Sequence, residues 1–71
     1  MIQQIINTLV ATNLPIETQD ERAIKFRGVF NNQSIIIVAD HYQRQVLFVS
    51  TSLRQQKTYS YDQFFYKFCL N

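Results

Sequence analysis

The sequence predicts a single α+β domain in which a helix, a three-stranded antiparallel meander and a second helix follow one another. Three observations lead to this fold: an amphipathic N-terminal pattern, two central runs that are apolar at consecutive positions, and an aromatic stripe at helical spacing near the C-terminus. A length of 71 residues fits one domain, 1–71, near the size at which one core is barely sufficient. Both helices are expected on one face of the sheet.

Residues 2–13 show the clearest helical pattern. Apolar side chains recur at spacings of three and four from Ile2 to Val10, while amide and hydroxyl side chains occupy the opposite face. Asn13 tolerates the left-handed conformation that ends many helices, and Pro15 prevents the helix from continuing. We expect this helix to dock on the core.

The middle of the chain predicts three strands. Residues 22–30 alternate between an apolar and a basic face, after an acidic segment, 16–21, that is expected to be a solvated loop. Asn31-Asn32 tolerates the positive φ angles of a tight hairpin, so the next strand, 34–39, pairs antiparallel with the first. The third strand, 45–51, resembles the second because both are apolar on both faces.

The C-terminal part predicts a polar loop followed by a helix. Residues 53–57 are expected to form the loop, and the sequence leaves open whether 57–60 adds a fourth strand. Ser60 and Gln63 have the spacing of a capping box. Apolar side chains then recur at helical spacing: Tyr61, Phe64, Phe65, Phe68 and Cys69.

One face of the predicted sheet has no helix to cover it. We expect the helices to cover the face that carries Ile24, Phe26 and Phe30, because it is the most apolar face of the first strand. The opposite face then exposes a patch of four aliphatic side chains: Ile36, Val38, Leu47 and Val49. If the helices cover the other face, the exposed patch becomes Ile35, Ile37, Val46 and Phe48. Either patch predicts a protein interface, with another protein or a second copy of this chain as partner.

The sequence contains no recognisable catalytic or cofactor site. One histidine and one cysteine cannot supply the ligands of a zinc site, and a single glycine cannot build a phosphate-binding loop. His41 adjoins Asp40, but no spacing links it to the hydroxyls of Ser50, Thr51 and Ser52. We therefore expect no enzymatic activity, no cofactor and no metal.

These exclusions favour a small protein-binding module of the adaptor or inhibitor type, a class that includes phage-encoded inhibitors of bacterial defence systems. The alternative is a nucleic-acid-binding module, which a net charge of +2 permits. Its phosphate contacts would come from the first strand and the 53–57 loop: Arg22, Lys25, Arg27, Arg54 and Lys57. The lone Cys69 and the lack of a long apolar run favour a cytoplasmic location without membrane contact.

Overall fold

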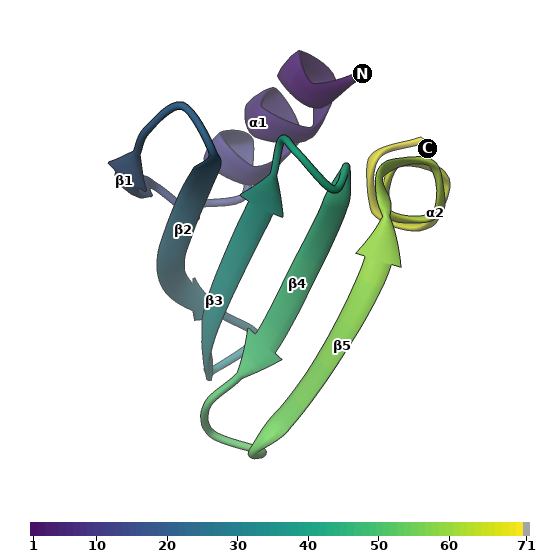
Figure 1. The fold of residues 1–71 in the computed structure, drawn as a ribbon. Coiled ribbons are helices and arrows are strands. Elements are labelled where there is room, and N and C mark those ends of the chain that lie inside the picture. The colour runs from purple at the N-terminus through teal and green to yellow at the C-terminus, as the bar shows by residue number, and fades with distance from the viewer. Residues whose placement is uncertain (71) are drawn as a thin grey trace.

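A computed structural model describes residues 1–70 and shows one antiparallel sheet of five strands in the order β1-β2-β3-β4-β5 (Figure 1). A helix precedes the sheet, and a short helix that continues as a π-helical segment follows it. The elements are α1 (Ile2–Ala11), β1 (Ile16–Gln19), β2 (Ala23–Phe30), β3 (Gln33–Asp40), β4 (Gln45–Ser50), β5 (Gln55–Ser60), α2 (Tyr61–Phe64) and η1 (Phe65–Cys69).

The prediction of a three-stranded meander is wrong. The three expected strands are β2, β3 and β4, and the sheet has an additional edge strand on each side. Every side chain of β1 is exposed, and Tyr59 is the one buried side chain of β5. Backbone hydrogen bonds to one neighbouring strand are enough to hold these strands in the sheet. They therefore need no apolar face, and their sequences show no apolar alternation. The segments 16–21 and 53–57 therefore resembled loops.

The local backbone structure agrees with the sequence at three places. Asn31 and Asn32 have φ angles of 51° and 62°, which confirms the positive φ expected of the β2–β3 turn. Asn13 has a φ of 65° just after α1. At the start of α2, the Ser60 side chain accepts a hydrogen bond from the Gln63 backbone N–H at 3.1 Å, while Gln63 Oε1 accepts one from Ser60 N–H at 3.0 Å. This is the predicted capping box.

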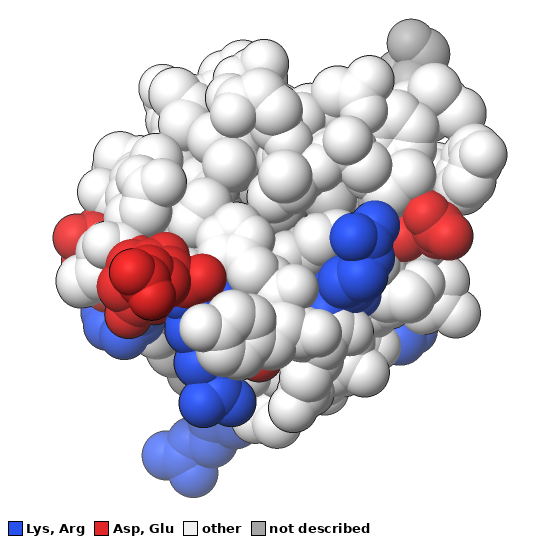
Figure 2. All heavy atoms as spheres, turned by 45° about the horizontal axis from the view of Figure 1, so that its top comes forward, with Lys and Arg blue, Asp and Glu red and all other residues white. Residues whose placement is uncertain are grey.

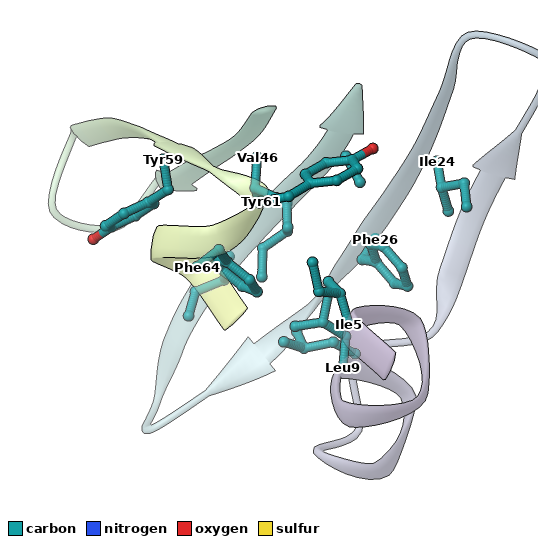
Figure 3. Close-up of a cluster of buried hydrophobic side chains, with 12 residues drawn as sticks. Ile5, Leu9, Ile24, Phe26, Val46, Tyr59, Tyr61 and Phe64 are labelled. Atoms are coloured by element: carbon teal, nitrogen blue, oxygen red, sulfur yellow. The ribbon is translucent and has the colours of Figure 1, made fainter. Parts of the chain in front are cut away.

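Both helical segments pack on the same face of the sheet and enclose one core (Figure 3). In the core, Ile5 and Leu9 of α1 and Tyr61 and Phe64 of α2 pack with sheet residues that include Phe26 and Val46. The largest fully buried side chains are Phe26, Phe64, Ile5, Ile24, Ile37 and Val46. The helices therefore cover the face of Ile24 and Phe26.

Gly28 permits the close approach of the segment that follows α1. A Cβ atom added to Gly28 would lie 2.8 Å from Leu14 Cδ2 and 3.0 Å from the backbone oxygen of Asn13. An alanine at this position would force the Leu14 side chain and the backbone of Asn13 to shift. Leu14 is thereby held against the end of the core.

Within residues 1–70, no helix is long and apolar enough to cross a membrane.

Candidate functional site

The four residues predicted as an interface lie together on the sheet face opposite the helices. Val38 is paired directly with Leu47, and Ile36 with Val49, across β3 and β4. Burial alternates along β3, where Ile35, Ile37 and Ala39 are buried and the intervening residues are less so. All four predicted residues are half-buried. They are partly shielded because they occupy the centre of the sheet, where neighbouring side chains cover their flanks.

Charged and polar side chains border this open-face patch. On one side, Lys25 pairs with Val38 and Arg27 with Ile36. Both cations contact the carboxylate of Glu17 on β1, with Nζ–Oε2 of 3.5 Å for Lys25 and Nε–Oε1 of 2.8 Å for Arg27. On the other side, Leu47 and Val49 pair with two uncharged residues of β5, Thr58 and Gln56. An apolar centre with a polar rim is the usual anatomy of a protein–protein interface.

The basic residues predicted for nucleic-acid binding do not form one surface. Lys25 and Arg27 lie on the open face, whereas Lys57 pairs with Phe48 on the helix-covered face. β2 and β5 are separated by two other strands, which places them about 14 Å apart at the usual strand spacing. Arg22 lies 3.9 Å from Asp40 (Nε to Oδ2), and Arg54 is in the β4–β5 turn. In Figure 2, basic and acidic side chains lie next to one another rather than forming a continuous basic surface.

The polar residues around His41 stabilise turns. Asp40 Oδ1 accepts hydrogen bonds from the backbone N–H groups of Tyr42 at 2.9 Å and Gln43 at 3.1 Å. Asp20 Oδ1 likewise accepts hydrogen bonds from the backbone N–H groups of Arg22 at 2.8 Å and Ala23 at 2.9 Å. The hydrogen bonds from Ala23 and Arg22 lower the pKa of the Asp20 carboxyl below its ordinary value. Both carboxylates therefore close backbone turns.

The hydroxyl groups considered as nucleophiles lie at the other end of β4 from His41. Thr51 Oγ1 donates to the Ser34 carbonyl at 3.1 Å, and Ser52 Oγ accepts from the Ser34 N–H at 3.0 Å. Ser50 is buried. The structure thus brings none of the three to His41, and residues 1–70 contain no cluster of three metal-ligating side chains.

A second apolar surface, not identified from the sequence, lies on the helix-covered side. Phe30 and Phe68 are 44% and 39% exposed, respectively, at a hollow of about 150 Å³ between α1 and η1. The Phe48 and Phe68 rings are stacked, with their centroids 6.3 Å apart. The hollow exists because the helices leave part of their sheet face uncovered. Its lining is Thr8, Leu9, Thr12, Leu14, Phe30, Ile35, Ile37, Phe48, Phe64 and Phe68.

No protein-family model matches this chain, and no curated protein or solved structure shows significant similarity to it.

Proposed function

We propose that this chain is a non-enzymatic protein-binding module that acts through the open face of its sheet, on another protein or on a second copy of itself. The observation that carries the proposal is the contiguous patch of Ile36, Val38, Leu47 and Val49, formed by two directly opposed pairs. An adaptor or inhibitor of this kind acts by occupying a surface on its partner.

The energetics favour an interface wider than the four aliphatic side chains. Full burial of such a side chain stabilises by about 1.5–3 kcal/mol, and at most about a third of each of the four is still exposed, so burying the rest contributes no more than about 2–4 kcal/mol. Association costs about 4–15 kcal/mol in lost translational and rotational freedom, so the patch alone does not produce tight binding. The rim must contribute, through the methylene stems of Lys25 and Arg27 and through the hydroxyl and amide groups of Thr58 and Gln56.

The test compares matched lysine substitutions on the two sides of the sheet. Val38→Lys and Leu47→Lys place a charge in the open-face patch. Val10→Lys places the same charge on α1, where the aliphatic side chain is 49% exposed. We expect sedimentation velocity to show concentration-dependent association of the wild type and of Val10→Lys, and monomers for the other two. Circular dichroism checks that each variant is folded.

A partner other than a second copy is tested with a photo-crosslinking amino acid at position 38 or at position 10. Adducts that form in a lysate of the organism that encodes the chain, from position 38 and not from position 10, would support a heterologous partner at this face. A wild type that stays monomeric at millimolar concentration, together with identical adducts from both positions, would overturn the proposal.

A further inference from the structure

β5 is the last strand of the sheet, and one of its sides is unpaired (Figure 1). The Tyr61 N–H donates to the Arg44 carbonyl at 3.1 Å, in continuation of the β4–β5 register. Antiparallel strands form backbone hydrogen bonds at alternate residues. The backbone N–H and C=O groups of Lys57 and Tyr59 therefore point to β4, and those of Gln56 and Thr58 point to the free edge. The Ser60 N–H is already bonded to Gln63. The available edge is therefore the backbone of Gln56 and Thr58.

A hollow of about 510 Å³ runs beside this edge. Its floor is Lys57, Thr58 and Tyr59 of β5, and its wall is Gln63, Tyr66 and Lys67 of the C-terminal helical segment. Tyr66 is 66% exposed, so its ring is available to a molecule in the hollow. An extended chain placed along the edge would thus lie against a wall of side chains.

Two lysines give this hollow a positive charge. Lys57 Nζ lies 5.2 Å from the centroid of the Tyr59 ring, and Lys67 Nζ lies 5.6 Å from the same centroid. Among residues 1–70, salt bridges involve Arg22, Lys25 and Arg27, and neither lysine forms one. Within the described residues the two ammonium groups therefore contact aromatic rings but no carboxylate, and they lie in the same hollow as the free edge of β5. This combination suits an extended segment that carries carboxylates.

Lysine on an edge strand also protects against pairing with a second copy. Two β5 edges paired antiparallel would bring the lysines of both copies together, and like charges oppose this. The same charges attract an acidic strand. A nucleic acid fits less well: it could stack on Tyr66, because Tyr59 is 9% exposed and flanked by the two lysines, but it would leave the backbone groups of Gln56 and Thr58 without strand partners.

We propose that β5 accepts an added strand from an acidic segment of a partner protein, which bonds to the backbone of Gln56 and Thr58 and places carboxylates beside Lys57 and Lys67. Alternate residues of an extended strand lie about 6.7 Å apart on one face, so acidic residues at every second position reach both lysines. This site lies at the sheet edge and does not depend on the open-face patch.

The probe is a fluorescent octapeptide of alternating Glu and Val, and the measurement is its anisotropy on titration with the full chain. Three further probes accompany it: the same peptide with one central Val replaced by Pro, an octapeptide of alternating Lys and Val, and an oligothymidylate of similar length. We expect only the first peptide to bind, and more weakly as salt rises. The proline peptide lacks one N–H, so it tests strand pairing without altering the protein.

Variants of the chain then locate the site. Lys57→Gln and Lys67→Gln are each expected to weaken binding about 2- to 5-fold, as for exposed ion pairs, and the double variant more. Lys25→Gln, on the open face, is the matched control and leaves binding unchanged. No binding of the acidic peptide, equal binding of the proline peptide, an equal loss with Lys25→Gln, or preferential binding of the oligothymidylate would each overturn the inference. None of these results depends on whether Val38→Lys abolishes association.

Discussion

The Tyr61 hydroxyl donates a hydrogen bond to the backbone carbonyl of Asp40 at 2.9 Å, which joins the first residue of α2 to the last residue of β3. The Arg44 guanidinium carbon lies 5.6 Å from the centroid of the same ring. These contacts hold the start of the C-terminal helix against the β3–β4 turn. They thereby position Gln63, Tyr66 and Lys67, which form the wall beside β5.

Removal of the Tyr61 hydroxyl should weaken this connection. We expect Tyr61→Phe to lower the free energy of unfolding by about 1 kcal/mol, because the ring stays buried while the Asp40 carbonyl loses its donor. Urea denaturation measures the change. Tyr66→Phe is the control, since Tyr66 is 66% exposed, and it should have no measurable effect. Equal stability of wild type and Tyr61→Phe would contradict the structural role of this bond.

Stability at alkaline pH should depend on the same residue. Burial, and then the charge of Asp40, raise the pKa of Tyr61 above its ordinary value. The unfolded chain therefore loses this proton at about pH 10, before the folded one does. The stability that protonated Tyr61 contributes is fully present below about pH 10. It is lost as the pH rises through the higher pKa of Tyr61 in the folded state. Urea midpoints measured across this range should fall less steeply for Tyr61→Phe, and an identical decline would show that Tyr61 contributes nothing.

Substitution of Gly28 should destabilise the fold. Alanine restricts the unfolded chain, which favours folding by about 0.4–1 kcal/mol. The 2.8 Å and 3.0 Å approaches to Leu14 and Asn13 outweigh this gain, because one of the atoms involved belongs to the backbone. We expect a net loss of about 1–2 kcal/mol for Gly28→Ala in thermal or urea unfolding. Val29→Ala, at a neighbouring exposed position, should change stability much less, and a stabilised Gly28→Ala would show that the overlying segment can move.

Substitution of two serines near the end of β4 by alanine should change the free energy of unfolding in opposite directions. Ser50 is 3% exposed, and within residues 1–70 its Oγ has no hydrogen-bond partner. A buried hydroxyl without a partner costs about 1–3 kcal/mol, so Ser50→Ala should stabilise the chain by about 1 kcal/mol. Ser52→Ala removes the acceptor of the Ser34 N–H and should destabilise it by up to about 1 kcal/mol. Differential scanning calorimetry of both variants tests the contrast, and a loss of stability in Ser50→Ala would mean that its hydroxyl is satisfied.

Local patterns in the sequence determined α1, the three central strands and the C-terminal cap. The stripe from Ile2 to Val10, the Asn31-Asn32 turn and the Ser60–Gln63 pair each depend on residues a few positions apart, so no knowledge of the rest of the fold was needed. Such signals act through neighbouring backbone and side-chain groups. Edge strands offer no comparable signal: the sequence predicted loops at 16–21 and 53–57 and left open whether 57–60 is a strand, whereas the structure has β1 and β5 in these segments.

Tertiary structure alone decided which surfaces are open. β3 and β4 are apolar on both faces, so the sequence left two alternative sets of four residues as the candidate for an uncovered apolar patch. The packing of Ile5, Leu9 and Phe64 against Phe26 and Ile37 selected the set that contains Val38 and Leu47. The contact between Tyr61 and Asp40, 21 residues apart, and the meeting of Lys57 with Lys67 around Tyr59 likewise had no local pattern to predict them. They exist because chain segments distant in sequence pack together, and that packing has no periodicity within a single segment.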